Sequence, residues 1–283
     1  MDMHASPDPT NDRMIFGQHR RDADGMTIAA ASLGAQLLSW QAAGRERLFL
    51  GPLDRATPGT AMRGGVPVIF PQFSMRGPGG RHGFARRMPW RPVEGTTPDR
   101  LAFVLEDDAY TRGEWPHPFR LRLEAALSPW TLRMALDVVN TGATSFDFAA
   151  ALHTYLAVDD TAGVRISGLS GRRFLDSTRD VDAVDTEPVL ALDGGEIDRI
   201  YADVASPLHL EDGPHRLDIA MSGFSDVVVW NPGPAKAAQL PDLAPGDHLR
   251  FVCVEAGRIL VPVHLEPGES WRGEQSLSLS PAA

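Results

Sequence analysis

Cysteine is almost absent from this chain. Cys253 is the single one among 283 residues, so no disulfide bond can form within the chain. Small secreted domains commonly depend on several disulfides, and the sequence excludes that architecture. Hydrophobic residues make up 43% of the chain, which is enough for a sizeable core.

Positive charge is also scarce. The chain has 27 lysines and arginines against 37 aspartates and glutamates, so its net charge is −10. Nucleic acids and anionic membranes are bound by basic surfaces, so neither is an expected partner. An anionic small molecule would have to be held by a local group of arginines that acts against the overall charge.

Long apolar segments are missing. The most apolar window, residues 28–40, is interrupted by serine, glycine and glutamine and falls short of the roughly 20 residues that span a bilayer. Residues 1–13 are polar, have no apolar signal core and are expected to form a disordered leader. We therefore expect a soluble, cytoplasmic protein, and a monomer.

Helical periodicity is weak, whereas strand signals are strong. A short helix is expected only at residues 235–240, after two prolines. Residues 119–127 largely alternate apolar with polar side chains, a Ser-Pro-Trp turn follows, and residues 131–140 repeat the pattern. Two such segments joined by a short turn are typical of an antiparallel hairpin.

The remaining extended segments are residues 26–40, 45–50, 66–70, 146–158 and 251–257. The 27 glycines and 23 prolines are spread along the chain, so they supply turns and mark no linker between domains. We predict an all-β fold: a single large antiparallel β-sandwich over residues 14–283, with one concave face.

One stretch concentrates polar groups around a buried strand. Arg63 precedes Gly64-Gly65, where missing side chains let a ligand approach the backbone, and the apolar residues 66–70 follow. Residues 82–86, if extended, place His82, Phe84 and Arg86 on one face. These side chains favour a pocket for an anion, although Gly-Pro junctions are common in β-proteins and a lone histidine is usually structural.

Two ionisable residues interrupt apolar strands. His153 lies on the face of segment 146–158 that carries two alanines, which leave room in front of it. Most such histidines are satisfied within the core, but the small neighbours favour a site. Glu255 lies between Val254 and Ala256, where an unpaired carboxylate is costly to bury. A buried carboxyl with a shifted pKa is a candidate for catalysis.

Asp198 and Trp230 are weaker candidates. Asp198 alone would be interpreted as a surface acid. Trp230 precedes Asn231-Pro232 and fits either packing or a platform for a sugar ring.

Six short motifs in a fixed order resemble one known family. They are RGGVP at 63–67 with FPQF at 70–73, HGFAR at 82–86, LHTY at 152–155, DRIY at 198–201, VWNP at 229–232 and CVEAG at 253–257. The set resembles the hexose-6-phosphate mutarotases, also called glucose-6-phosphate 1-epimerases, within the aldose 1-epimerase superfamily. The resemblance spans roughly residues 25 to 275.

The resemblance implies a galactose-mutarotase-like β-sandwich that interconverts the α and β anomers of a 6-phosphorylated hexose, without cofactor or metal. It implies that His153 is the general acid and Glu255 the general base. It also implies that Arg63, His82 and Arg86 line the substrate site, and that Asp198 holds sugar hydroxyls. We further expect Arg81 and Trp230 to bind substrate.

The sequence departs from the family pattern at residues 74–80 and at Arg81, which stands where glutamine is frequent. Three alternatives stay open: a mutarotase for unphosphorylated aldoses, a non-catalytic sugar-binding sandwich, and a metallohydrolase. No histidine spacing typical of a metal site supports the last of these.

Overall fold

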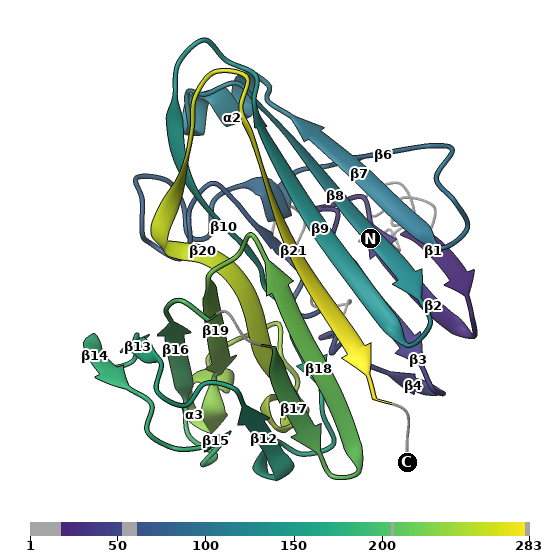
Figure 1. Ribbon diagram of the computed structural model, residues 1–283, viewed down its shortest axis with the longest axis vertical. Coiled ribbons are helices and arrows are strands. Elements are labelled where there is room, and N and C mark those ends of the chain that lie inside the picture. The colour runs from purple at the N-terminus through teal and green to yellow at the C-terminus, as the bar shows by residue number, and fades with distance from the viewer. Residues whose placement is uncertain (1–17, 53–60, 205–206, 281–283) are drawn as a thin grey trace, which may run out of the picture.

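The computed structural model describes residues 18–52, 61–204 and 207–280; the expected leader, residues 1–13, lies outside them. Within these ranges the chain forms three sheets in which every paired strand is antiparallel (Figure 1). The prediction of an antiparallel all-β fold is confirmed.

The largest sheet, here called the outer sheet, has the order β15-β12-β17-β18-β21-β9-β8-β7-β6. Its strands, in chain order, are β6 (Arg91–Pro92), β7 (Arg100–Glu106), β8 (Phe119–Ser128), β9 (Thr131–Asn140), β12 (Val164–Ser167), β15 (Val189–Ala191), β17 (Leu208–Asp212), β18 (His215–Ser222) and β21 (Ser270–Leu279).

The second sheet, here called the site sheet, has the order β14-β13-β16-β19-β20-β10-β5, and β11 also pairs with β20. Its strands are β5 (Val68–Ile69), β10 (Phe146–Leu152), β11 (Tyr155–Ala157), β13 (Arg173–Asp176), β14 (Val181–Val184), β16 (Ile197–Tyr201), β19 (Asp226–Asn231) and β20 (Phe251–Leu265).

A smaller N-terminal sheet and a few short helices complete the described chain. The sheet consists of β1 (Gln18–Ala23), β2 (Met26–Ala31), β3 (Leu37–Ala42) and β4 (Arg45–Glu46). The helices are α2 (Ala109–Glu114), α3 (Gly233–Ala237) and three 3₁₀ turns at Ala85–Arg87, Thr161–Gly163 and Asp247–Leu249. None of the described helices is long and apolar enough to span a membrane.

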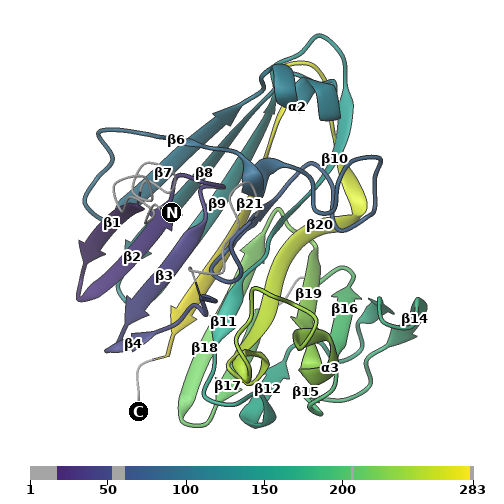
Figure 2. The same ribbon diagram turned by 180° about the vertical axis from the view of Figure 1, so that it is seen from behind.

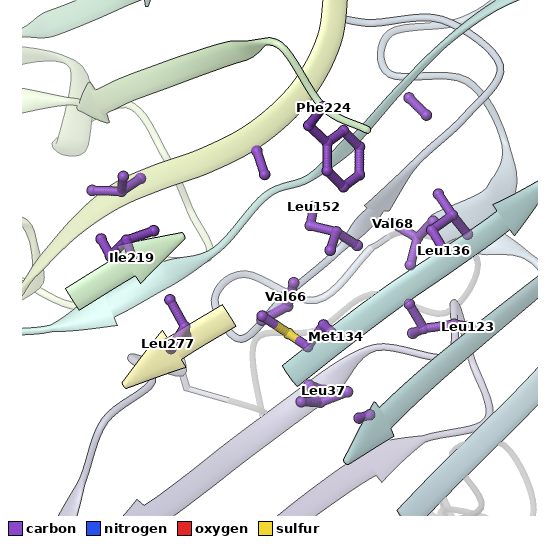
Figure 3. Close-up of a cluster of buried hydrophobic side chains, with 14 of the residues drawn as sticks. Leu37, Val66, Val68, Leu123, Met134, Leu136, Leu152, Ile219, Phe224 and Leu277 are labelled. Carbon is purple, nitrogen blue, oxygen red and sulfur yellow. The ribbon is translucent and has the colours of Figure 1, made fainter. Parts of the chain in front are cut away.

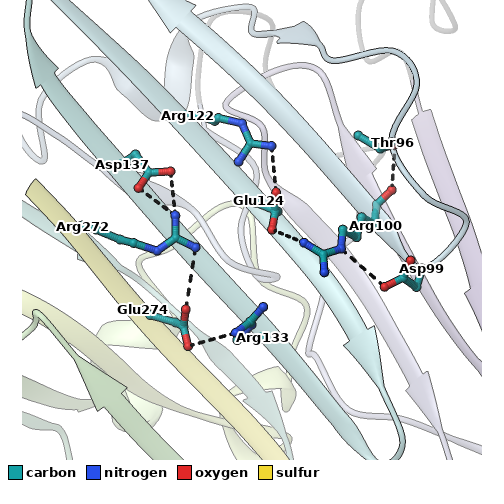
Figure 4. A network of polar contacts seen from close by, with 9 residues as sticks. All are labelled: Thr96, Asp99, Arg100, Arg122, Glu124, Arg133, Asp137, Arg272 and Glu274. Atoms are coloured by element: carbon teal, nitrogen blue, oxygen red, sulfur yellow. Dashed lines mark hydrogen bonds and ion pairs between the residues drawn. The ribbon is translucent and has the colours of Figure 1, made fainter. Parts of the chain in front are cut away.

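The predicted hairpin is formed by β8 and β9, which pair from Phe119–Asn140 to Ser128–Thr131. Their alternation sorts the side chains onto two faces. The exposed face carries a network of ion pairs, in which Glu124 contacts Arg100 and Arg122 and, on β9 and β21, Asp137 contacts Arg272 (Figure 4). The apolar residues are thereby directed inward.

All three sheets contribute to one apolar core. Met134 and Leu136 of the outer sheet meet Val68 and Leu152 of the site sheet and Leu37 of the N-terminal sheet, and all are fully buried (Figure 3). Burial of this kind, at roughly 25 cal/mol per Å² of apolar surface, stabilises the sandwich and fixes the strands that carry the site.

The central part of the site sheet carries apolar residues on both faces. Val254 and Ala256 of β20 point into the main core, whereas Ile69, Ala151, Tyr155 and Cys253 belong to a second apolar cluster on the opposite face. Period-two alternation therefore places Glu255 on the face of the second cluster, away from the main core.

Several extended segments are shorter than predicted. Residues 26–40 form two strands that fold back on each other, because Gly34 and Ala35 have positive φ between them. Segment 146–158 is divided into β10 and β11. Of residues 66–70 only β5 is paired as a strand, and residues 45–50 keep only β4, with isolated bridges at Leu48 and Leu50.

The helix predictions are partly right. A short helix does follow Pro232, but α3 ends at Ala237 rather than at 240. Helix α2 was not predicted; it begins at an Asp108–Thr111 capping box, a local signal in a segment too short to show helical periodicity.

Candidate active site

A cavity of about 530 Å³ opens on the face of the site sheet that carries the second apolar cluster. Residues of the segment between β4 and β6 and of the helix α3 contribute to its lining; the course of this segment and the position of α3 can be followed in Figure 2. All eight residues singled out from the sequence line it: Arg63, Arg81, His82, Arg86, His153, Asp198, Trp230 and Glu255.

Strand register brings His153 to Glu255. Leu152 of β10 pairs with Ala256 of β20, and Tyr155 of β11 pairs with Cys253, so the intervening His153 comes opposite Glu255. Two main-chain hydrogen bonds hold the stretch between β10 and β11. The His153 N–H donates to the Pro67 carbonyl at 3.0 Å, and the Thr154 carbonyl accepts from the Val254 N–H at 3.1 Å. The His153 Nε2 atom lies 3.3 Å from Glu255 Oε1.

Burial shifts both groups toward their uncharged forms. It raises the pKa of Glu255 well above its ordinary value, and Asp198 adds to this while Arg86 opposes it. Burial also lowers the pKa of His153, with help from His82, Arg86 and Arg63. The two groups lie within reach of a proton transfer. The pKa of Glu255 is raised and that of His153 is lowered, so the two values move toward each other.

His82 is held as a neutral hydrogen-bond donor. Its Nδ1 accepts from the Ser74 N–H at 3.2 Å, so the ring proton lies on Nε2. Burial, and then Arg86, Arg81 and Arg63, lower the pKa of His82 to about 2. The imidazole therefore stays uncharged at any working pH.

The extended conformation expected for residues 82–86 is wrong. His82 and Gly83 have positive φ, and Ala85–Arg87 form a 3₁₀ turn. His82 and Arg86 still reach the cavity together, but through this turn rather than through strand alternation. Phe84 instead packs in the main core.

The glycine pair has a different role from the one expected. A Cβ atom on Gly64 would lie 2.4 Å from the Phe49 carbonyl oxygen, and one on Gly65 would lie 1.9 Å from that of Leu37. The missing side chains therefore make room for neighbouring main chain, not for a ligand.

Arg63 is balanced by a carboxylate. Its Nε and NH2 donate to Asp242 at 3.0 and 3.2 Å, and its NH1 donates to the Tyr155 hydroxyl at 3.0 Å. Burial alone would lower the pKa of Arg63, but Tyr155 and Asp242 outweigh it and raise the pKa. Two of its five N–H groups make no hydrogen bond to a described residue and can bind a ligand.

Arg86 has no such carboxylate partner among the described residues. Its NH2 donates to the Arg81 carbonyl at 3.1 Å, and its buried Nε makes no hydrogen bond within the described chain. Burial, followed by nearby arginines, lowers the pKa of Arg86 to about 10, so it stays charged at neutral pH. A half-buried cation with free donors is suited to a bound anion.

Asp198 and Trp230 form part of the wall. They pair across β16 and β19, and Trp230 also meets His153 edge to face with ring centroids 5.9 Å apart. Burial raises the pKa of Asp198. Asp198 is therefore not the exposed loop acid that its local sequence suggested.

Other lining residues were not singled out from the sequence. Arg76 and Met75 lie on a loop that Gln72 ties at both ends, by accepting from the Gly79 N–H at 2.7 Å and donating to the Ser74 and Gly79 carbonyls. Lys236 reaches the rim from α3 and pairs with Glu196. Only the glycine-rich composition of the loop hinted at such a feature.

No group of three His, Cys, Asp or Glu side chains within the described ranges lies in an arrangement that could hold a metal ion. His82, His153 and Glu255 share the cavity, but the first two meet through their rings, with centroids 5.8 Å apart.

Comparisons with known proteins agree on one family. Residues 19–278 match the aldose 1-epimerase family. Several relatives carry the name "Putative glucose-6-phosphate 1-epimerase". The one from Cenchrus ciliaris is 32% identical over 267 residues, which cover 88% of this chain and 80% of the relative. The one from Salmonella typhimurium is 34% identical over 238 residues, covering 78% and 76%.

Solved structures show the same fold. The crystal structure of a "putative mutarotase" (YeaD) from Salmonella typhimurium has a TM-score of 0.84 at 29% identity and covers 93% of this chain and 90% of its own. A galactose mutarotase-like protein from Lactobacillus casei has a TM-score of 0.74 at 19% identity and covers 93% and 100%. The predicted galactose-mutarotase-like sandwich is confirmed.

Proposed function

Since this chain belongs to the aldose 1-epimerase family, we propose that it interconverts the α and β anomers of a hexose 6-phosphate, with glucose 6-phosphate as the first candidate. The observation that carries the proposal is the His153–Glu255 contact of 3.3 Å. It lies in a cavity whose wall holds Arg86, which has no carboxylate partner among the described residues. The names of the relatives support the phosphosugar.

The reaction needs one proton removed from the anomeric hydroxyl and one delivered to the ring oxygen. Because burial keeps both groups uncharged, our proposal begins with transfer of the Glu255 proton to His153 across their 3.3 Å contact. The Glu255 carboxylate then takes the O1 proton while the His153 imidazolium protonates O5, and the C1–O5 bond breaks to give the open aldehyde. After rotation about C1–C2, O5 attacks C1, His153 takes the O5 proton back, and Glu255 returns a proton to O1. Protons and charge balance over the cycle.

The substrate's own charge favours the reactive form of His153. Arg86 and Arg63 help to lower the pKa of His153, so a phosphate dianion beside them offsets their charge and favours the imidazolium. His82, as a neutral Nε2–H donor, hydrogen-bonds the oxygen on which negative charge develops.

Arg86 is the main phosphate contact in this proposal, and Arg63 and Arg81 support it. Arg86 offers unused donors and an uncompensated charge, whereas Arg63 keeps its position through Asp242. Asp198 accepts hydrogen bonds from sugar hydroxyls, and Trp230 gives the ring an apolar face.

We also propose that the protein works as a monomer in the cytoplasm. Every residue assigned above comes from one chain, and a charged sugar phosphate is retained inside cells by the apolar interior of the membrane.

The test is a coupled anomerisation assay with the purified protein on a panel of hexose 6-phosphates and the matching free sugars. We expect a higher kcat/KM on a phosphorylated hexose. A preference for free glucose would favour an aldose mutarotase, and no acceleration on any sugar would favour a non-catalytic sugar-binding protein.

A further inference from the structure

The described part of the chain gives the second ring nitrogen of His153 no hydrogen-bond partner of the kind that usually fixes a catalytic imidazole. In many enzymes the second ring nitrogen donates to a carboxylate or carbonyl, which sets the orientation of the ring. Here Nε2 faces Glu255, and the buried Nδ1 makes no hydrogen bond of ordinary geometry to any described residue. Some other contact has to define the plane of this ring.

Aromatic packing supplies that contact. The Tyr155 ring lies parallel to the His153 ring, with centroids 4.8 Å apart and an interplanar angle of 8°. Trp230 and His82 meet the same imidazole edge to face, at 5.9 and 5.8 Å. Among the described residues, Tyr155 is the ring that stacks parallel on a flat face of the imidazole, so it opposes rotation about the Cβ–Cγ bond.

Tyr155 is itself held at several points. Its N–H donates to the Gly65 carbonyl at 2.9 Å, its hydroxyl accepts from Arg63, and Asp242 fixes Arg63 through two hydrogen bonds. Tyr155 is 3% exposed, and its ring centroid lies 5.2 Å from that of Phe251. The stack therefore rests on a rigid support.

We propose that Tyr155 is a positioning residue, which acts through its ring by holding the His153 imidazole in the plane that faces Glu255 and the substrate. The inference rests on the proposed acid–base function of His153. It assigns no proton transfer to the Tyr155 hydroxyl.

The test compares Tyr155→Phe, which keeps the stacked ring, with Tyr155→Leu, which removes it. Tyr155→Leu should lower kcat by about 10- to 100-fold with KM within about threefold, because small misplacements of a catalytic group have effects of this size. Tyr155→Phe should restore kcat to within about fivefold of wild type. If Tyr155→Leu does not fold, Tyr155→Met replaces it, because methionine fills similar space without a flat face.

Tyr201 provides the matched control. It is a fully buried tyrosine of the site sheet whose hydroxyl donates to Asp185 and accepts from Arg199, and it does not line the cavity. Tyr201→Leu should reduce stability and leave kcat unchanged. Equal kcat in Tyr155→Leu and Tyr201→Leu would overturn the proposal, as would an equal loss in Tyr155→Phe and Tyr155→Leu.

Crystal structures of the two Tyr155 variants give a readout that does not depend on activity. The 3.3 Å contact of His153 Nε2 with Glu255 should persist in Tyr155→Phe and be lost in Tyr155→Leu. An unchanged imidazole in both variants would refute the positioning role. If the wild type proves inactive on every hexose 6-phosphate, the proposed function fails, and these structures still decide the role of Tyr155.

Discussion

Glu255 is almost completely buried, at 1% exposure, and its Oε2 makes no hydrogen bond to any described residue. His153 is the basic side chain that contacts it. A carboxyl in such a place reduces stability when it ionises, so its retention is best explained by chemistry rather than by stability. Functional groups commonly have this cost.

Loss of either member of the pair should abolish most of the activity. We expect His153→Asn and Glu255→Gln each to lower kcat by at least ~10²-fold, the lower range for general acid–base catalysis, while the circular dichroism spectrum stays that of the wild type. Near-wild-type turnover in either variant would remove that residue from the mechanism.

Glu255→Gln should also change how stability depends on pH. Because the pKa of Glu255 is raised in the folded protein, the folded state binds more protons than the unfolded state above the ordinary glutamate pKa. Wild-type stability should therefore fall, relative to Glu255→Gln, as the pH rises from about 5 to 8, with a limiting slope of about 1.4 kcal/mol per pH unit.

Urea denaturation of both proteins across this pH range measures the effect. The unfolding free energy of Glu255→Gln minus that of the wild type should be lowest at the acid end of this range and rise with pH. A constant difference would mean that Glu255 ionises as easily in the folded protein as in the unfolded one.

Among single residues, the sequence indicated His153 and Glu255 because an ionisable group in an apolar strand is conspicuous. It could not indicate the partners of Arg63, since Asp242 lies 179 positions away in a loop with no motif. Tyr155 ends the LHTY motif that contains His153, but its parallel stack depends on the bend between β10 and β11, which residue patterns do not encode.

Among the elements, the turn that leads from Arg63 into β5 places the site against β3. Gly65 has φ of +60° and its main chain passes so close to Leu37 that a Cβ atom would lie 1.9 Å from the Leu37 oxygen. The Gly65 carbonyl also accepts from the Tyr155 N–H. A displacement of the main chain at Gly65 would therefore move Tyr155, which lines the cavity.

Gly65→Ala should therefore destabilise the protein by more than a positive φ alone explains. Gly44→Ala is the matched control, because Gly44 has φ of +70° and open space around its Cβ position. We expect about 1 kcal/mol of lost stability for Gly44→Ala and about 3 kcal/mol or more for Gly65→Ala, since the clash adds overpacking strain. Thermal and urea denaturation measure both losses. Equal losses would mean that the main chain around Gly65 moves to admit the Cβ atom without a loss of stability.

Regular strands were predictable where alternation was long, as in β8 and β9. The segment at residues 82–86 was not, because its form depends on contacts with distant main chain: Phe84 and Ala85 donate to the Phe70 carbonyl, and a Cβ atom on Gly83 would lie 2.1 Å from the same oxygen. Local sequence carries no record of such an approach.

Over the whole molecule, a net charge of −10 surrounds a cavity lined by Arg63, Arg76, Arg81, Arg86 and Lys236. Arg63 and Lys236 have carboxylate partners, Asp242 and Glu196, whereas the half-buried Arg86 has none among the described residues. Such a local excess attracts an anionic substrate against the overall field. Preference for a phosphorylated sugar should therefore depend on Arg86 most of all.

The proposal that Arg86 binds the phosphate of a hexose 6-phosphate is tested by kcat/KM of Arg86→Ala on glucose 6-phosphate and on free glucose. We expect a loss of roughly 10- to 150-fold on the phosphosugar, because charge-assisted hydrogen bonds contribute about 1.5–3 kcal/mol and each 1.36 kcal/mol is tenfold. Activity on glucose should change little. Arg91→Ala, which removes an exposed arginine outside the cavity, should affect neither substrate. Equal losses on both sugars in Arg86→Ala, or a wild-type enzyme that prefers free glucose, would contradict the account.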